Sequence, residues 1–271
     1  MAEMLTGLLS EGDVQQVASA QRDAAEALSA DPTQLLVRRQ STVSLTDLAP
    51  LIEHTILSQT ATGDQVLRKC REVEEFGFHG ICVNPKWVAL SAKELAGSSR
   101  AVISVVGFPL GATVTSIKVH EATLAVNDGA TELDMVADLG ALRERDLSGF
   151  AEDIRAVVDQ VGKVPVKVIL ECGLLTDAYE LALAASLAAL AGARFVKTST
   201  GFAYNKSGGE SQPLGATLKD VSILAHSVGG TVGIKASGGI NDYPQATALV
   251  RAGATRIGTS SGPAIMRGSL R

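Results

Sequence analysis

The chain is poor in aromatic residues and in cysteine. Aromatic side chains make up 4% of its 271 residues, and its three cysteines form neither a CxxC pair nor a metal-ligand spacing: Cys70, Cys82 and Cys172. An odd, dispersed set of cysteines argues against a small disulfide-stabilised domain and favours a reducing compartment. The histidines also lack the mutual spacing of a metal site: His54, His79, His120 and His226. The sequence therefore predicts no metal centre.

Long apolar runs and clusters of basic residues are missing as well. The most apolar stretch, residues 179–193, is shorter than the roughly 18 residues of a membrane span and is better interpreted as a buried helix. The N-terminus has no basic segment followed by an apolar one, so we expect no signal peptide. The formal net charge is -5, with scattered basic residues. This pattern predicts a cytoplasmic protein with no nucleic-acid or membrane partner.

Apolar residues are abundant, at 46% of the chain, and alanine, valine, leucine and glycine dominate. Such a composition is typical of parallel strands that are buried between helices. The length fits either two small domains or a single α/β barrel, since barrels run to roughly 250 residues.

Residues 1–45 differ from the rest because they contain few β-branched clusters and favour helices. Asp31 and Pro32 resemble an N-cap with a first-turn proline, and Ser44 and Asp47 suggest a short capped helix. We predict a helical extension over residues 1–45, packed on a barrel domain over residues 46–271. A partner-binding arm is the alternative.

From residue 51, eight strand-like segments alternate with amphipathic ones. The segments predicted as strands are 51–57, 80–85, 101–109, 131–137, 164–172, 193–200, 231–239 and 254–262. The helices predicted between them cover 64–76, 86–96, 115–128, 148–161, 177–191, 215–228 and 243–252, and glycines follow them as expected of helix ends. Eight such units predict a closed (β/α)8 barrel. An open doubly wound sheet is the alternative, but no GxGxxG follows the first strand.

Two lysines lie within strand-like segments that are neighbours in the predicted barrel, Lys197 and Lys235. If the strand registers match, both amines share one pocket, where burial and like charge each lower the pKa of an amine. One amine would then be uncharged near neutral pH and able to attack a carbonyl. The alternative is that each lysine is half-buried and paired with a carboxylate, as Lys167 could be with Glu171.

Other polar residues also cluster in the C-terminal halves of the predicted strands, where barrels build their sites. Glu132 and Asp134 lie two apart on one strand and share a face. Asp134 could move a proton near Lys235 or merely orient it. Asn84 ends another strand and is a candidate contact for a sugar hydroxyl.

Three turns of small residues suggest a phosphorylated ligand. Residues 237–240 follow the seventh strand, residues 256–262 span the eighth strand and its turn, and residues 199–202 follow Lys197. Glycine amides and serine hydroxyls can form a nest for phosphate, and barrels often bind phosphate after strands seven and eight.

Eight segments in this order resemble the deoxyribose-phosphate aldolase family: LIEHTIL, GICVNP, VVGFPLGA, ELDMV, KVILE, FVKTSTGF, GIKASGGI and RIGTSSG. The resemblance runs from about residue 48 to residue 262. It implies a class I aldolase of deoxyribonucleotide catabolism, without metal or other cofactor, that is a cytoplasmic homo-oligomer, by default a dimer. The implied reaction is the reversible cleavage of a sugar phosphate, 2-deoxy-D-ribose 5-phosphate, to D-glyceraldehyde 3-phosphate and acetaldehyde.

By motif position, the resemblance implies that Lys197 forms the Schiff base, that Lys235 lowers the pKa of Lys197, and that Asp134 joins Lys235 in a proton relay. It implies supporting roles for Glu53 and Thr198. The implied phosphate site is lined by Gly201, Gly238, Gly239, Ser260 and Ser261.

The chain departs from the family pattern at two places near this site. Glu53 stands where the family usually has aspartate, and the loop at residues 202–215 is longer than usual. Two other functions remain open on the residues alone. One is a phosphate-binding barrel isomerase or epimerase that uses carboxylate or histidine bases or a metal, and the other is a sugar-phosphate sensor without turnover.

Overall fold

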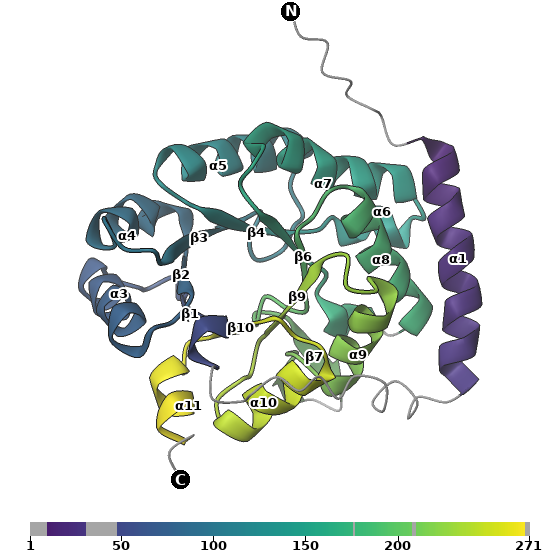
Figure 1. Cartoon of the computed structure of the whole chain (residues 1–271). Coiled ribbons are helices and arrows are strands. Elements are labelled where there is room, and N and C mark those ends of the chain that lie inside the picture. Colours follow the sequence, from purple (N-terminus) through teal and green to yellow (C-terminus); the bar gives the residue numbers. More distant parts are fainter. Residues whose placement is uncertain (1–9, 31–47, 176, 208–209, 269–271) are drawn as a thin grey trace, which may run out of the picture.

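The computed structural model describes residues 10–30, 48–175, 177–207 and 210–268. Eight parallel strands close into a barrel in the order β1-β10-β9-β6-β5-β4-β3-β2, and Figure 1 shows them as an inner ring surrounded by helices. The strands are β1 (Ile52–Ile56), β2 (Gly80–Val83), β3 (Ala101–Val106), β4 (Glu132–Val136), β5 (Val166–Ile169), β6 (Phe195–Lys197), β9 (Gly233–Ser237) and β10 (Arg256–Thr259). All eight strands match predicted segments, and the (β/α)8 barrel is confirmed.

Each predicted helix between the strands is also present. These helices are α3 (Gly63–Phe76), α4 (Val88–Glu94), α5 (Thr115–Asn127), α7 (Leu147–Val161), α8 (Ala178–Leu190), α9 (Leu218–Ser227) and α10 (Tyr243–Ala252). Helix α3 begins at a capping box formed by Thr62 and Gln65, and it ends at Gly77, whose φ of 70° places it in the left-handed region. Two short helices, α6 (Leu139–Arg143) and α11 (Gly262–Gly268), and 3-10 turns at Ala49–Leu51, Pro85–Trp87 and Cys172–Leu174 complete the barrel.

Helix α1 (Glu11–Ala30) lies outside the barrel against α8 (Figure 1). Val14 and Ala18 on α1 are buried, and the Tyr179 hydroxyl on α8 donates to the Ala18 carbonyl over 3.3 Å. This part of the predicted extension is therefore a helix packed on the main domain. The predicted boundary at residues 45/46 and the caps at Asp31, Ser44 and Asp47 lie outside the described residues.

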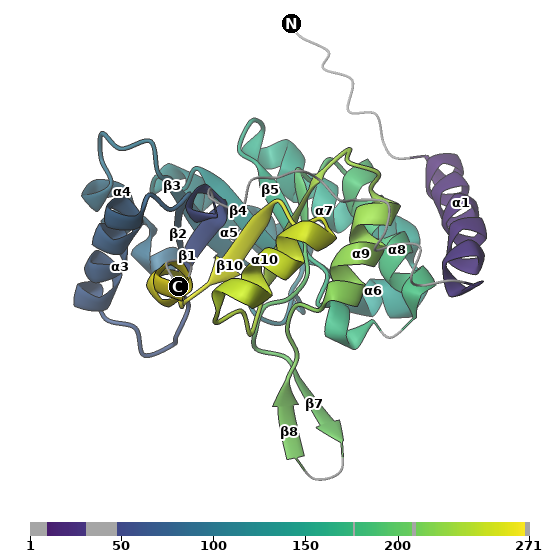
Figure 2. The same cartoon turned by 60° about the horizontal axis from the view of Figure 1, so that its bottom comes forward.

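A two-stranded antiparallel hairpin interrupts the segment between β6 and α9. Its strands are β7 (Tyr204–Ser207) and β8 (Glu210–Pro213), with Tyr204 opposite Pro213, and Figure 2 shows the hairpin projecting away from the barrel. The long loop predicted over residues 202–215 thus contains a hairpin that was not expected. No helix in the described part of the chain is long and apolar enough to cross a membrane.

The core between barrel and helices also holds a buried ion pair. Lys118 on α5 has no exposed side-chain surface, and its Nζ lies 2.6 Å from Oδ2 of Asp153 on α7, which is 4% exposed. Asp153 also accepts a hydrogen bond from the Thr115 hydroxyl over 2.8 Å. The pair ties α5 to α7, and removing one partner would leave a buried charge without its counter-ion.

We therefore expect Asp153→Ala to lower the free energy of unfolding by about 3 kcal/mol or more in urea denaturation. The control is Asp159→Ala, which removes the half-exposed Arg155–Asp159 pair on the same helix and should cost about 1 kcal/mol or less. Equal losses in the two variants would show that the Lys118–Asp153 pair does not stabilise the fold.

Candidate active site

The two lysines singled out by the sequence lie side by side. Lys197 ends β6, Lys235 is the third residue of β9, and their Cα atoms are register partners. Both amines bind the same oxygen of Asp134, so a carboxylate lies between them. The Asp134 Oδ2 atom lies 2.7 Å from Lys197 Nζ and 2.6 Å from Lys235 Nζ.

Glu53, Asp134, Lys197 and Lys235 form a cluster of ion pairs, and three of them do not lie at the ends of their strands. Glu53 is the second residue of β1, and Asp134 and Lys235 are the central residues of five-residue strands. Only Lys197 among these four ends its strand. The expectation that these polar residues lie in the C-terminal halves of their strands is therefore wrong for Asp134, which is central both in the predicted segment and in β4.

A third lysine belongs to the same cluster. Lys167 on β5 is the register partner of Asp134, and its Nζ lies 3.0 Å from Asp134 Oδ1 and 2.6 Å from Glu132 Oε2. The suggested Lys167–Glu171 pair is wrong. Glu171 turns away to the loop after β6, where its carboxylate accepts from the amide and hydroxyl of Thr200 over 3.1 and 2.5 Å.

Glu53 reaches across the barrel to two of these lysines. Its carboxylate accepts a hydrogen bond from Lys235 and lies 3.4 Å from Lys167 Nζ. Arg256 approaches the same carboxylate from β10, with its Nε 3.8 Å from Glu53 Oε1. The longer side chain of glutamate therefore meets Lys235.

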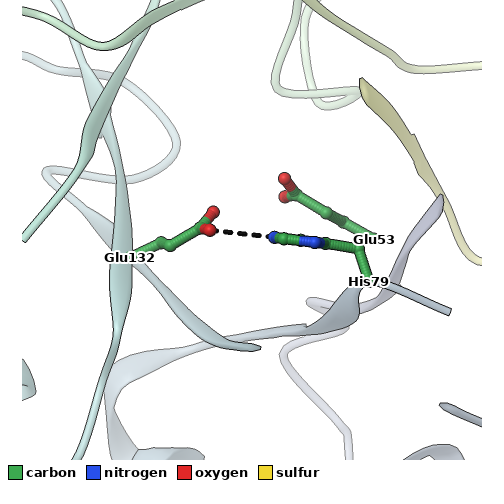
Figure 3. Close-up of side chains that lie close together, drawn as sticks. All are labelled: Glu53, His79 and Glu132. Atoms are coloured by element: carbon green, nitrogen blue, oxygen red, sulfur yellow. Dashed lines mark hydrogen bonds and ion pairs between the residues drawn. The ribbon is translucent and has the colours of Figure 1, made fainter. Parts of the chain in front are cut away.

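Glu53 also lies near His79 and Glu132, and Figure 3 shows these three side chains pointing toward one another. Their ligand atoms all lie within 4.8 Å of one another, and His79 Nε2 is 2.8 Å from Glu132 Oε1. This spacing could hold a cation. The Lys167 ammonium already binds both carboxylates, so a lysine supplies the positive charge here.

The charges of the cluster fix its protonation. Burial alone would raise the pKa of Asp134, but the ammonium groups of Lys167, Lys197 and Lys235 outweigh burial and hold that pKa well below its usual range. Burial alone would lower the pKa of Lys235, but the carboxylates of Asp134 and Glu53 outweigh it and raise that pKa. Asp134 is therefore an anion and Lys235 a cation at neutral pH.

A cavity of about 520 Å³ opens above the cluster. Lys197 is the member of the cluster that lines it, whereas Lys235 and Lys167 are fully buried beneath. Phe202 forms part of the wall, and its ring meets Phe108 edge-on with centroids 5.2 Å apart. The remaining lining residues are Thr55, Ile56, Leu57, Ser58, Lys69, Thr200, Gly201, Tyr204, Ser237, Gly238, Gly239, Ile240, Asn241, Gly258, Thr259 and Ser260.

Four of the five predicted phosphate-site residues line this cavity: Gly201, Gly238, Gly239 and Ser260. Ser261 lies next to it, and its hydroxyl donates to the Asn241 side chain over 3.2 Å. Gly238 has a φ of 91°, and a Cβ on Gly215 would lie 2.4 Å from the Gly238 carbonyl oxygen. Glycine is needed at both positions to bring the two loops this close.

Two other predicted residues have contacts that place them beside the cavity. The Thr198 hydroxyl accepts from the Ser237 amide over 3.0 Å and donates to the Ser237 carbonyl, which joins β6 to β9 just above the two lysines. Asn84 donates from Nδ2 to the Leu57 carbonyl over 3.2 Å. Its contact with a sugar hydroxyl stays a prediction.

The sequence reasoning missed several residues of the site. Lys167 could have been found from its inward alternation on a strand beside Asp134. Thr55 and Asn241 could have been found as polar residues close to strand ends. Lys69 gave no such signal, because it lies on a helix and reaches the cavity only through the closure of the barrel.

A closed parallel barrel with a lysine at the floor of an open cavity, and small-residue loops at its rim, has the architecture of a barrel lyase. Residues 48–268 match the sequence profile of the DeoC/LacD family of aldolases. The chain belongs to this family.

Named relatives agree with this assignment. The deoxyribose-phosphate aldolase of Streptococcus gordonii is 47% identical over 217 residues, which cover 80% of this chain and 94% of that protein. The enzyme of the same name from Halalkalibacterium halodurans is 47% identical over 223 residues, 82% of this chain and 95% of that protein. A solved structure described as the tetrameric deoxyribose phosphate aldolase of Aeropyrum pernix has a TM-score of 0.75 at 33% identity, and covers 88% of this chain and 96% of that one.

The ion pairs beneath the cavity predict a loss of stability in acid. Burial alone would raise the pKa of Glu132, but the hydrogen bond with His79 and the Lys167 ammonium lower it from 4.5 to about 2. A depressed carboxyl pKa stabilises the fold above the unfolded value, and this stabilisation is lost as the pH falls toward the folded value. We expect the free energy of unfolding to fall between about pH 4.5 and pH 2, with Glu132 contributing about 3 kcal/mol at most.

Urea denaturation at a series of pH values measures this slope. Glu132→Gln should flatten it, whereas Glu152→Gln, at an exposed position of α7, should leave it unchanged. Identical slopes for Glu132→Gln and the unaltered protein would show that Glu132 is not the titrating group.

Proposed function

We propose that this protein is a class I aldolase that reversibly cleaves 2-deoxy-D-ribose 5-phosphate to D-glyceraldehyde 3-phosphate and acetaldehyde through a Schiff base on Lys197. One observation carries the proposal. Lys197 alone among the three clustered lysines lines the cavity, and its amine shares Asp134 Oδ2 with a second lysine. The named relatives and the family support the choice of substrate.

The ion pairs of the cluster distinguish Lys197 from the other two lysines. Lys167 lies within 4 Å of three carboxylates and Lys235 of two, whereas Lys197 has Asp134 as its carboxylate partner. Lys197 is therefore the lysine of the cluster with the fewest carboxylate partners, and it is the one that we propose as the nucleophile.

The neutral Lys197 nitrogen attacks C1 of the open-chain aldehyde, and the carbonyl oxygen takes up a proton. Loss of water from this adduct gives a protonated imine, which acts as an electron sink. A base removes the proton of the C3 hydroxyl, C3 becomes the carbonyl carbon of glyceraldehyde 3-phosphate, and the C2–C3 bond breaks. Its electron pair moves to C2 and forms an enamine, which is protonated at C2 and hydrolysed to acetaldehyde and the free amine.

Asp134 and Lys235 serve these proton transfers from beneath the cavity. Both are fully buried and hydrogen-bonded to each other, and Asp134 is bonded to Lys197 as well. In this arrangement Asp134 passes on the proton that Lys197 gives up, and the fixed positive charge of Lys235 keeps Asp134 an anion between transfers. Glu53 and Thr198 are proposed to hold this pair in place from β1 and from the end of β6.

The phosphate end of the substrate is proposed to lie at the loops after β6, β9 and β10. Gly201, Gly238, Gly239 and Ser260 line the cavity there, with Ser261 beside them. Backbone amides and hydroxyl groups of such loops bind phosphate oxygens. Asn84 is proposed to contact a sugar hydroxyl.

We also propose that the protein works in the cytoplasm as a homo-oligomer, by family resemblance a dimer. The Aeropyrum pernix structure is described as tetrameric, and sedimentation equilibrium would distinguish the two states.

Lys197→Leu should abolish cleavage while leaving the barrel folded, because the reaction has lost its nucleophile. Sodium borohydride with acetaldehyde should attach one ethyl group to the unaltered protein, and mass spectrometry of peptides should locate it at Lys197. Lys163→Leu, at an exposed position before β5, should retain both the activity and the adduct. An adduct on another lysine, or turnover in Lys197→Leu near that of the unaltered enzyme, would contradict the assignment.

Lys235→Leu should move the acid limb of the kcat/KM profile to higher pH. Without the Lys235 cation, Asp134 and Glu53 leave an excess of negative charge near Lys197, which favours its charged, unreactive form. Measuring initial rates between pH 5 and 10 tests this, with the exposed-site variant Lys93→Leu as the control. A profile that drops in height without moving would show that burial alone tunes Lys197.

A further inference from the structure

Lys69 lies at the cavity wall and comes from a helix, whereas the three lysines of the cluster come from strands. It belongs to α3, lines the cavity, and has 21% of its side-chain surface exposed. Its ammonium donates to the carbonyl oxygen of Ser260 over 2.8 Å. This contact places a positive charge directly against the loop that follows β10.

Two further side chains hold the Lys69 ammonium in place. Its Nζ lies 2.8 Å from His54 Nε2 and 3.5 Å from Glu72 Oε2. His54 is buried, with its ring 5.3 Å from that of Phe78, and burial together with the nearby Lys69 lowers the pKa of His54 to about 4. His54 is therefore neutral at pH 7 and adds no second cation. The Glu72 carboxylate lies 2.6 Å from His54 Nε2 and pairs with Lys69, but of these three side chains Lys69 is the one that lines the cavity.

The cavity lining contains two charged side chains, Lys69 and Lys197, and no carboxylate among the described residues. In the proposed reaction Lys197 forms the imine with C1, at the other end of the substrate from the phosphate. Lys69 is the cation that lies beside the loop carrying Ser260. Neutral amides and hydroxyls supply the other donors at this end of the cavity.

We propose that Lys69 binds the phosphoryl group of the substrate and determines the preference for a phosphorylated over an unphosphorylated aldehyde. This inference rests on the proposed function and adds a specificity-determining residue to it. A lysine ammonium is a point charge with three donors, so it can keep the Ser260 carbonyl and still offer a hydrogen to a phosphate oxygen. Charge-assisted bonds of this kind are about twice as strong as neutral ones.

The other role open to Lys69 is purely structural, as a tie between α3 and the loop after β10. The two roles differ in what they predict for a substrate without phosphate. A structural tie affects every substrate alike, because the loop itself moves. A phosphate ligand affects the phosphorylated substrate alone and acts mainly on KM.

The test compares Lys69→Gln, Lys69→Arg and the exposed-site control Lys163→Gln with the unaltered enzyme, using 2-deoxyribose 5-phosphate and 2-deoxyribose. Lys69→Gln should raise KM for the phosphorylated sugar about tenfold or more, with kcat within about threefold. Its kcat/KM for 2-deoxyribose should stay within about twofold, and Lys69→Arg should recover much of the lost affinity. Trapping of acetaldehyde on Lys197 by borohydride, which needs no phosphate, checks that the altered site is intact.

A second measurement separates this inference from the aldolase reaction. Inorganic phosphate should raise the thermal unfolding midpoint of the unaltered protein and of Lys163→Gln, and this rise should be lost in Lys69→Gln. If phosphate stabilises the protein through Lys69 but the protein cleaves neither sugar, the proposed aldolase function is wrong and phosphate binding by Lys69 still holds. Equal losses of kcat/KM for both sugars in Lys69→Gln would overturn phosphate binding by Lys69. An active Lys69→Gln enzyme with unchanged KM and unchanged stabilisation by phosphate would overturn it as well.

Discussion

The site depends on one carboxylate oxygen, Oδ2 of Asp134, which binds the amines of Lys197 and Lys235 at once. Three lysines converge inside this barrel, and each is almost completely buried. Without Asp134 they would repel one another in a region with little water, and an unpaired buried charge is among the costliest defects in a folded protein. The carboxylate of Asp134 offsets part of this buried positive charge, and it also accepts a hydrogen bond from the Lys197 nitrogen.

The three clustered lysines differ in their access to the cavity. Lys167 and Lys235 lie beneath the cavity, each held by two or more carboxylates that raise its pKa. Lys197 ends its strand and lines the cavity. In the reaction we propose, the two buried lysines act through their electrostatic field, and Lys197 carries out the covalent chemistry.

The fold could be predicted from sequence because its signals are local. Apolar segments with β-branched residues, separated by amphipathic stretches that end in glycine, specify each strand and helix in turn. The hairpin of β7 and β8 was missed because its letters, YNKSGGESQP, show no alternation of apolar and polar residues. Lys167 was placed with the wrong carboxylate for a related reason: sequence distance suggested Glu171, whereas the strand register sets Asp134 opposite it.

The two ends of the cavity come from different kinds of structural constraint. Lys197 and Lys235 are brought together by pairing of β6 with β9, which the order of strands already implies. Lys69 meets Ser260 across 191 positions of the chain, because β1 pairs with β10 when the barrel closes and α3 follows β1. Local strand pairing thus places Lys197, whereas barrel closure places Lys69. If the substrate uses both ends as we propose, only the complete barrel can bind it productively.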